Sequence, residues 1–368
     1  MQPTGSSSKR TRSSSRPPRR ASRRLSPAAD DSRFLKACRR EPTDVTPVWF
    51  MRQAGRYLAE YRARRQKHSL LELCHRPELA AEVTLQPVER LGVDAAILFA
   101  DILLPFEPLG LGLTFAASDG PQITRPIRDA AQVLELPPVD PAQDLGYVIE
   151  AVRLAARALP QHIPLIGFAG APFTLASYAI EGGSTRSFVL TKRFMYGEPR
   201  AWHALMERLA ELVGRYLAAQ AGAGARALQL FDSWVGCLSP ADYAAYVFPH
   251  SQRALALARR AGVPVIHFGT GTATFLADFA RAGGDVIGVD WRIPLDIAWE
   301  QLGPGRAIQG NLDPVALLAP RPLLEAGVRD VLARGGGRPG HIFNLGHGVL
   351  PETPVDALRR VVEIAHGG

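Results

Sequence analysis

Residues 164–174 read PLIGFAGAPFT, an apolar run that leads directly into a cluster of small and polar residues. Continuous apolar runs of this kind are typical of parallel strands that are covered on both faces. The runs that we expect to be strands are Val48–Phe50, Ala95–Phe99, Pro164–Phe168, Ala227–Phe231, Pro264–Phe268, Val286–Val289, Ala307–Gln309 and Ile342–Leu345. Because helical stretches separate these eight runs, the sequence predicts a single α/β domain, a (β/α)8 TIM barrel, over residues 31–368.

The stretches between the runs have the periodicity of amphipathic helices. Apolar residues recur at spacings of three and four over residues 145–159, and again over residues 202–216. No internal repeat and no interdomain linker interrupts the alternation. It therefore favours a barrel over a doubly wound open sheet.

Nearly every predicted strand runs directly into a polar or glycine-rich cluster. In chain order these clusters are MRQAGR, ADI, AGAPFT, DSW, GTGT, DW, GNLD and GHG. In a parallel barrel the carboxyl ends of all strands open on one face, and active sites are built there. We therefore expect these clusters to form one active site.

Almost all of the net charge of +8 is carried by the first thirty residues. That segment contains a single acid, Asp30, and the basic residues Lys9, Arg10, Arg12, Arg16, Arg19, Arg20, Arg23 and Arg24. Its Ser, Arg and Pro content leaves almost no large apolar side chain to bury, so residues 1–30 are predicted to be a disordered basic extension. The rest of the chain is close to neutral.

Three interpretations of the extension stay open. It is a solvated tail or the product of a start codon placed too early, an Arg- and Ser-rich transit peptide, or an arm for nucleic acid or an anionic surface. Because the remainder is nearly neutral, no nucleic acid is expected as a partner of the folded domain. A protein whose main function is nucleic-acid binding would bind with a steep salt dependence that deletion of residues 1–30 abolishes.

The cysteines and the apolar runs bear on the compartment. Cys38, Cys74 and Cys237 are scattered and form no CxxC pair, which fits a reducing compartment and argues against a structural zinc site. No run of about 18 apolar residues is present, and the N-terminus lacks the apolar core of a secretory signal. We therefore expect a cytoplasmic protein that does not associate with a membrane.

Two charged segments follow the first two predicted strands. The segment Arg52-Gln53-Ala54-Gly55-Arg56 carries two guanidinium groups, which bind carboxylates in bidentate fashion. Asp101 ends the second strand in apolar company, where a carboxylate needs donors or a positive partner. It is either a structural carboxylate, as a helix cap or buried ion pair, or a group that accepts ligand N–H bonds and stabilises positive charge.

Three further polar residues follow later strands or helices. Tyr178 is either a core tyrosine or a phenol that donates to a carboxylate. Ser233 has no GxSxG elbow, so it is a better hydroxyl donor to an anion than a nucleophile. His347 stands between two glycines at the end of the last strand, a place that favours function as much as structure. Gly269-Thr270-Gly271 is discounted as a dinucleotide fingerprint because Thr274 stands where glycine is needed.

Taken together, these segments resemble the uroporphyrinogen decarboxylase family, over residues 44–366. The stretches that carry the resemblance are PVWFMRQAGRYL, LQPVERLGVDAAILFADIL, PLIGFAGAPFTLASYAIEGG, ALQLFDSW, GVDW, QGNLDP and NLGHGVLPETP. RQAGRY, GFAGAPFT and NLGHG are specific as a set. Two departures are Ala59, where many relatives carry proline, and GTGT, which replaces a lysine-containing version of some relatives and puts a contact from that lysine in doubt.

The resemblance implies a barrel, a homodimer, and an enzyme without cofactor or metal. The implied reaction removes four acetate carboxyls from uroporphyrinogen III to give coproporphyrinogen III, a step of haem and porphyrin synthesis. By resemblance, the Arg52–Arg56 segment binds substrate carboxylates, and Asp101 binds the pyrrole N–H groups and stabilises the cationic intermediate. Tyr178, Ser233 and His347 match the remaining substrate contacts. These roles suit a substrate with eight carboxylates around four N–H donors.

Two other interpretations, a different enzyme and an inactive protein, have less support in the sequence. A zinc-dependent methyltransferase of the same superfamily needs thiolate ligands at strand ends, and His267-Phe268-Gly269 lacks a cysteine two residues after the histidine. A catalytically inactive scaffold would not need the full polar set at the strand ends.

Overall fold

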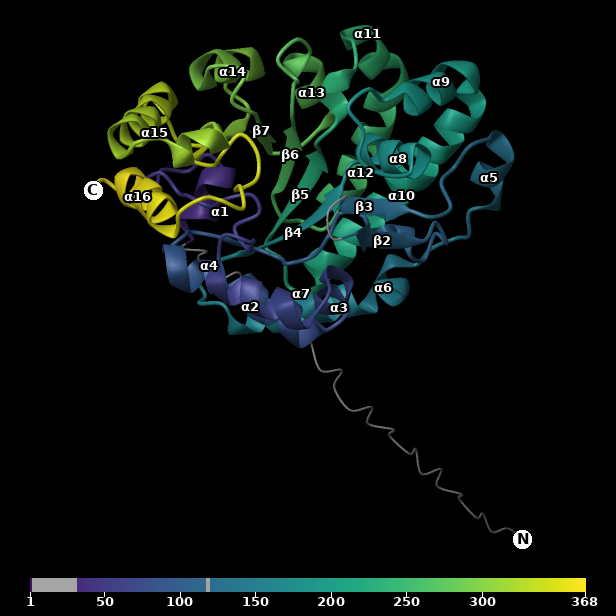
Figure 1. The fold of residues 1–368 in the computed structure, drawn as a ribbon, viewed down its shortest axis with the longest axis horizontal. Helices are drawn as coiled ribbons and strands as arrows, with labels where there is room; N and C mark the ends of the chain where they lie inside the picture. The colour runs from purple at the N-terminus through teal and green to yellow at the C-terminus, as the bar shows by residue number, and fades with distance from the viewer. Residues whose placement is uncertain (2–31, 117–119) are drawn as a thin grey trace. The chain divides into compact units, whose positions relative to one another are not determined.

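A computed structural model of the chain describes Met1, residues 32–116 and residues 120–368. The predicted extension of residues 1–30, apart from Met1, lies outside the described residues. Residues 32–116 and 120–368 form an α/β fold in which a curled parallel sheet is surrounded by helices (Figure 1).

The main sheet contains seven parallel strands in the order β1-β4-β5-β6-β7-β8-β9. Their bounds are Ala96–Ile97 (β1), Leu165–Gly170 (β4), Ala227–Asp232 (β5), Val265–Gly269 (β6), Val286–Gly288 (β7), Ala307–Gln309 (β8) and His341–Ile342 (β9). Seven of the eight predicted runs therefore contain or overlap a strand. Most strand residues are buried, as their apolar runs predicted.

The first predicted strand, Val48–Phe50, is present only as an isolated parallel bridge between Val48 and Phe343. The segment nevertheless bonds to both sides: Phe343 N–H donates to the Pro47 carbonyl at 2.8 Å, and Asp94 N–H to the Val48 carbonyl at 2.8 Å. The ladder stops because a side chain takes the next donor. The N–H of Phe50 donates to Gln53 Oε1 at 3.1 Å.

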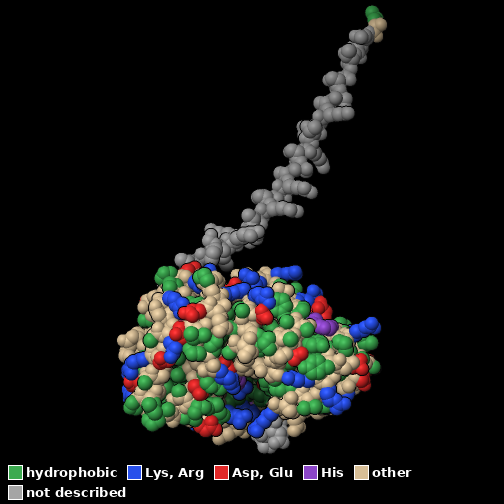
Figure 2. All heavy atoms as spheres, turned by 90° about the horizontal axis from the view of Figure 1, so that it is seen from above, with side chains coloured by type: hydrophobic (Ala, Val, Ile, Leu, Met, Phe, Trp, Pro, Cys, Tyr) green, Lys and Arg blue, Asp and Glu red, His purple; other side chains and the backbone are tan. Residues whose placement is uncertain are grey.

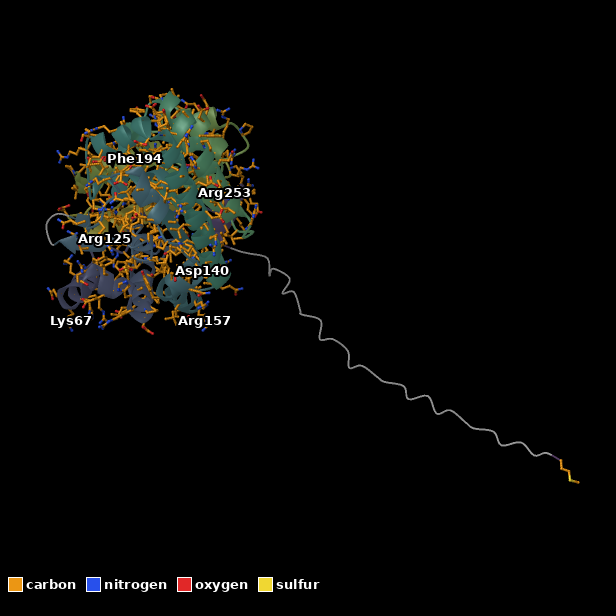
Figure 3. The ribbon with its side chains drawn as sticks, turned by 90° about the vertical axis from the view of Figure 1, so that its right-hand side faces the viewer. Lys67, Arg125, Asp140, Arg157, Phe194 and Arg253 are labelled. Carbon is orange, nitrogen blue, oxygen red and sulfur yellow. The ribbon has the colours of Figure 1, made fainter. Side chains whose placement is uncertain are left out.

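Sixteen α-helices flank the strands in residues 32–116 and 120–368. Charged side chains such as Lys67, Arg157 and Arg253 lie on their exposed faces (Figure 3). The first eight are α1 Arg33–Cys38, α2 Ala59–Lys67, α3 Leu70–Cys74, α4 Pro77–Leu91, α5 Ala130–Glu135, α6 Pro141–Asp144, α7 Gly146–Ala158 and α8 Pro172–Glu181. The others are α9 Val189–Gly197, α10 Pro199–Ala223, α11 Pro240–Asp242, α12 Phe248–Arg259, α13 Leu276–Ala282, α14 Leu295–Leu302, α15 Arg321–Gly335 and α16 Val355–Ala365. Among the described residues, no helix combines the length and the apolarity that crossing a bilayer requires.

The two predicted helical stripes form the buried faces of α7 and α10. In α10, the apolar residues from Trp202 to Tyr216 at spacings of three and four are buried, and the helix packs on β4, α7, α8 and α12. In α7, Val148, Ile149 and Val152 are buried against the core. Here the periodicity alone predicted which face is covered.

Several short elements were not predicted. An antiparallel hairpin pairs β2, Leu113–Ala116, with β3, Gly120–Ile123. Single turns of helix occur at η1 Leu104–Phe106, η2 Val235–Cys237, η3 Tyr243–Val247 and η4 Pro314–Leu318. Three of them, η1, η2 and η4, follow strands β1, β5 and β8, so they shape the loops at the carboxyl ends of the sheet.

Candidate functional site

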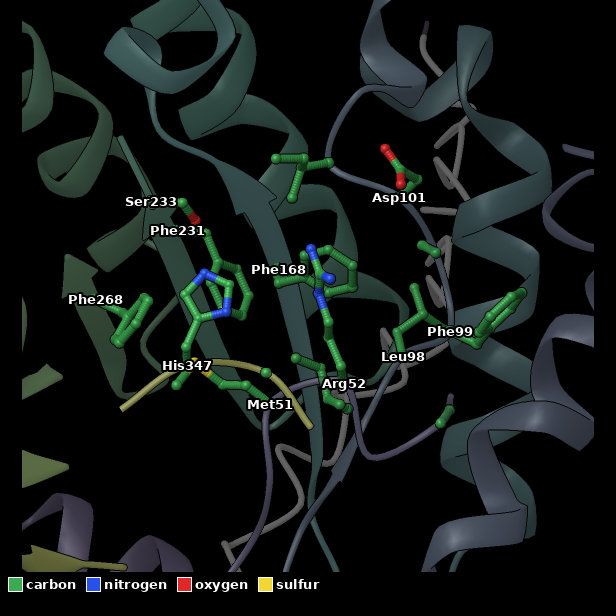
Figure 4. A pocket seen from close by; sticks show the side chains of 15 residues that line it. Met51, Arg52, Leu98, Phe99, Asp101, Phe168, Phe231, Ser233, Phe268 and His347 are labelled. Carbon is green, nitrogen blue, oxygen red and sulfur yellow. The ribbon is translucent and has the colours of Figure 1, made fainter. Parts of the chain in front are cut away.

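A cavity opens at the carboxyl ends of the strands (Figure 4). Its lining residues are Met51, Arg52, Ala54, Ile97, Leu98, Phe99, Ala100, Asp101, Ile102, Phe168, Phe231, Ser233, Phe268, His347 and Gly348. The space-filling view shows a hollow with basic side chains gathered at its border (Figure 2). Four of the eight strand-end clusters, MRQAGR, ADI, DSW and GHG, thus contribute to one apolar cavity. The clusters AGAPFT, GTGT, DW and GNLD, which were expected to join them, are absent from its lining.

One wall of the cavity is aromatic. Phe168, Phe231 and Phe268 lie at the ends of the neighbouring strands β4, β5 and β6. The rings of Phe168 and Phe231 meet edge to face at 5.6 Å, and those of Phe231 and Phe268 at 5.8 Å. This wall was missed in the sequence, although each phenylalanine closes a predicted strand. It can pack against a large planar or puckered ring.

Asp101 lies in the cavity wall just beyond β1, at the start of the loop that leads to η1. One carboxylate oxygen accepts the N–H of Leu103 at 2.9 Å. Burial raises the pKa of Asp101, while the Leu103 hydrogen bond and the charge of Arg52 act in the opposite direction. A carboxylate with so few protein donors is suited to accept N–H groups of a ligand or to face a positive charge.

Arg52 reaches into the same cavity, and Figure 4 shows its guanidinium between His347 and Asp101. Among the described residues it makes no hydrogen bond and no ion pair. Its backbone has φ +59°, a left-handed conformation that is uncommon outside glycine. A Cβ at Gly348 would lie 2.4 Å from Arg52 Cδ, so any other residue there would displace the Arg52 side chain. An arginine held in this way is free to bind an anion.

His347 lines the opposite side of the cavity from Asp101. Burial, and then the charges of Arg52 and Arg292, lower its pKa to about 4. The ring is therefore neutral near pH 7 and can donate one N–H while the other nitrogen accepts.

Ser233 and Tyr178 come from neighbouring elements. Ser233 follows β5 and lines the cavity, and its carbonyl accepts the hydroxyl of Thr270 at 2.5 Å. Tyr178, on α8, is stacked on Trp234 at 3.8 Å and does not line the cavity. Burial and the charge of Asp101 raise its pKa, so the phenol is close enough to sense that carboxylate.

The segment Arg52–Arg56 divides between the cavity and the surrounding structure. Ala54 lines the cavity, whereas Gln53 is buried and donates to the Ala95 carbonyl at 3.1 Å. At Gly55 a Cβ would lie 2.9 Å from the Arg52 carbonyl, so this glycine serves the turn. Arg56 is exposed and is absent from the cavity lining. The structure thus brings together Arg52, Ala54, Asp101, Ser233 and His347, and leaves Gln53, Gly55, Arg56 and Tyr178 outside the lining.

A buried carboxyl beneath Ser233 was also missed. Asp232 accepts the hydroxyl of Thr174 at 2.9 Å, and its second oxygen has no partner among the described residues. Burial raises its pKa to about 7. The only available signal was its place in the DSW cluster.

His267, the histidine considered as a zinc ligand, lies outside the cavity lining. It is fully buried on β6 and stacks on Phe279 with ring centroids 3.7 Å apart. Its surroundings are those of a core side chain.

Comparisons with known proteins point to one family. The family model described as uroporphyrinogen decarboxylase (URO-D) matches residues 29–368. A relative named uroporphyrinogen decarboxylase from Sorangium cellulosum is 59% identical over 91% of this chain and 95% of its own length. Proteins of the same name from Carboxydothermus hydrogenoformans and Chloroflexus aggregans are 56% and 57% identical, each over 90% of this chain and 95% and 94% of their own lengths.

Solved structures with low identity share the fold. A methyltransferase from Methanosarcina mazei superposes with a TM-score of 0.73 at 20% identity, covering 91% of this chain and 97% of that one. A B12-independent methionine synthase from Shewanella sp. W3-18-1 gives 0.54 at 11% identity, covering 78% and 87%. These likenesses concern architecture, whereas the family model and the identities of 56–59% concern ancestry. The chain therefore belongs to the uroporphyrinogen decarboxylase family.

Proposed function

We propose that this protein is a uroporphyrinogen decarboxylase that converts uroporphyrinogen III into coproporphyrinogen III in porphyrin and haem biosynthesis. The reaction removes the carboxyl groups of four acetate side chains as carbon dioxide. The observation that carries the proposal is that Asp101 and Arg52 line the same apolar cavity, where Arg52 makes no hydrogen bond or ion pair with the described residues and Asp101 accepts one backbone N–H from them. A ring of N–H donors surrounded by carboxylates is complementary to that arrangement.

Asp101 is the proposed centre of the chemistry. Loss of carbon dioxide leaves an electron pair on the side-chain carbon, and a pyrrole ring protonated within the substrate accepts that pair. Asp101 accepts the pyrrole N–H groups and stabilises the positive ring, so the substrate supplies its own electron sink. No cofactor and no metal is needed in this scheme. The side-chain carbon then takes up one proton, delivered by Arg52 or by water that Arg52 orients, and the pyrrole ring gives up the proton that it had gained. Each cycle therefore replaces one carboxylate with one hydrogen and releases one carbon dioxide.

The remaining residues bind the periphery of the macrocycle. Arg52 takes a carboxylate in bidentate fashion, and Ser233 and His347 donate single hydrogen bonds. Arg56 and Tyr178 lie outside the cavity lining, so we assign them to carboxylates that extend beyond it. Gln53, Ala54 and Gly55 contribute through the backbone turn that carries the two arginines. The three phenylalanines pack against the rings.

The proposal includes features of the fold and the assembly. The segment Val48–Phe50, which is bonded to both Phe343 and Asp94, takes the place of the eighth barrel strand. Residues 31–368 are the catalytic domain, and residues 1–30 are an extension without a part in the chemistry. The free thiols Cys38, Cys74 and Cys237 suit a cytoplasmic enzyme. The working form is a homodimer, without nucleic acid or membrane as a partner.

The direct test is anaerobic incubation of the purified, chelator-treated protein with uroporphyrinogen III, followed by oxidation and chromatography of the porphyrins. We expect stepwise appearance of hepta-, hexa-, penta- and tetracarboxylate products without any added cofactor. The same protein carrying Asp101→Ala serves as the control for spontaneous decarboxylation. Recovery of the octacarboxylate alone from the unmodified protein would contradict the proposal.

A further inference from the structure

The turn after β7, residues 290–293, is fixed from three directions. Asn311 Nδ2 donates to the carbonyls of Asp290 and Ile293 at 2.8 and 2.7 Å. A Cβ at Gly346 would lie 2.5 Å from the backbone nitrogen of Trp291, so the glycine before His347 packs directly on this turn. The GVDW and GNLD clusters thus form one rigid unit beside the His347 loop.

Within this turn, Asp290 and Trp291 hold the side chain of Arg292. Asp290 is 1% exposed and accepts the N–H of Gly271 at 2.8 Å as well as the backbone N–H and the guanidinium of Arg292. The guanidinium carbon lies 4.2 Å from the centroid of the Trp291 ring. The ion pair with Asp290 and the stacking on the ring of Trp291 together fix the orientation of the guanidinium.

Arg292 has hydrogen-bonding capacity that the described residues do not use. Its side chain is 53% exposed, and in residues 32–116 and 120–368 Asp290 is its only acidic partner. The turn that carries it packs on Gly346, the residue before His347, and the charges of Arg292 and Arg52 both act to lower the pKa of His347. Arg52 belongs to the cavity lining, and Arg292 lies outside the lining on the turn that follows β7.

We propose that Arg292 is a further substrate-binding residue, which holds a peripheral carboxylate of the tetrapyrrole at the rim of the cavity while Asp290 and Trp291 position it. The inference rests on the proposed function. Because Arg292 is half exposed and lies outside the cavity lining, which contains Asp101 and Arg52, we assign it to binding rather than to the chemical step. Its removal should then weaken substrate binding without slowing the bound substrate.

The test is steady-state kinetics of Arg292→Gln with uroporphyrinogen III. For a half-exposed ion pair we expect KM to rise about fivefold with kcat within about twofold of the unmodified enzyme. Arg292→Lys keeps the charge and should stay within about twofold in both constants. Arg281→Gln is the matched control, since Arg281 also pairs with Asp278 and lies over an aromatic ring, Phe248, but is not among the charges that act on His347.

A readout independent of turnover is the NMR titration of His347. Its pKa should rise in Arg292→Gln, which lacks one of the depressing charges, and should not move in Arg281→Gln. An unchanged KM for Arg292→Gln in an active enzyme, or an equal rise for Arg281→Gln, would overturn the inference. If the unmodified protein fails to decarboxylate the substrate, the proposed function itself falls, and the titration still reports whether the charge of Arg292 reaches the cavity.

Discussion

Two aspartates stand at opposite ends of the short strand β1 and have opposite surroundings. Asp94, before the strand, accepts the N–H of Val48 at 2.7 Å and pairs with Arg33 at 3.2 Å and with His366 at 2.8 Å. Asp101, beyond it, has one backbone donor and a raised pKa. The carboxylate of Asp94 has three partners within the protein. The carboxylate of Asp101 has a single backbone donor among the described residues, so it can accept hydrogen bonds from a ligand.

Arginines repeat the contrast between the two ends of the sheet. At the end where the strands begin, Arg40 donates to the Pro304 carbonyl at 2.7 Å, and Arg306 donates to the carbonyl of Gly284. At the cavity, Arg52 makes no such bond within the described part of the chain. The two arginines at the amino end of the sheet thus bind the protein's own carbonyl groups, whereas Arg52, at the carboxyl end, keeps its hydrogen-bond donors available for a ligand.

The largest effect is expected from Asp101→Ala, which should lower kcat by about 10³-fold because the cationic intermediate loses its counter-charge. Asp101→Glu should retain part of the activity. Because burial disfavours the charged form of Asp101, its removal should not lower the free energy of unfolding. The anaerobic assay and urea unfolding measure the two quantities. Near-full activity of the alanine variant would refute the role of Asp101.

Gly348→Ala tests whether the position of Arg52 matters. The new methyl group would lie 2.4 Å from Arg52 Cδ and 2.7 Å from Cγ, so the stem of the side chain must move. We expect kcat/KM to fall by about 10²-fold, the scale of a displacement of about 1 Å in a catalytic group. The control is Gly222→Ala in α10, where nothing lies within 4 Å. Equal activity of both variants would show that Arg52 need not be held in place.

Asp94→Ala should have the opposite effects to Asp101→Ala: it should lower stability and leave activity almost unchanged. It leaves the buried N–H of Val48 without an acceptor and breaks the pairs with Arg33 and His366. We expect the free energy of unfolding to fall by about 2 kcal/mol, while kcat/KM of the folded enzyme stays within about twofold. A large loss of kcat at full stability would erase the distinction between the two ends of β1.

The last effect concerns pH. His347 has a pKa of about 4 in the fold, below its ordinary value, so the unfolded chain binds a proton that the native chain does not. Stability therefore falls as the pH decreases from about 6.5 to 4, and His347→Gln should lose about 2 kcal/mol less over that range. Because His250 and His341 also have a pKa of about 4, urea unfolding at pH 7 and pH 4.5 must compare the variant with the unmodified protein. An identical loss in both would contradict the sign.

Much of the fold could be predicted because burial leaves a periodic trace. The strands that close on Phe168, Phe231 and Phe268 were visible as apolar runs, and the stripes of α7 and α10 identified their buried faces. The segment Val48–Phe50 has an equally apolar pattern, yet a ladder also needs free backbone donors. Gln53 takes the donor of Phe50, and Asn344 Oδ1 takes that of Met51 at 3.1 Å. Side-chain competition of this kind leaves no periodic signal.

The candidate site was predictable in its residue types more than in their directions. The clusters at the strand ends indicated Asp101, Ser233 and His347, and all three line the cavity. The spacing of Arg52 and Arg56 could not show that only the first faces inward, because this depends on the left-handed backbone at Arg52. Arg292 was overlooked because its meaning depends on Asp290 and on a glycine 54 positions away, Gly346.

The positive φ at Arg52 creates a conflict between stability and activity at this position, which matters for engineering a more stable enzyme. A non-glycine residue in that conformation costs on the order of 1 kcal/mol, so Arg52→Gly is a replacement that a stability screen would select. The selected protein would have a higher melting temperature. It would also have lost the guanidinium that we propose binds the substrate in the cavity. At this position, selection for thermal stability alone would therefore lower the catalytic activity.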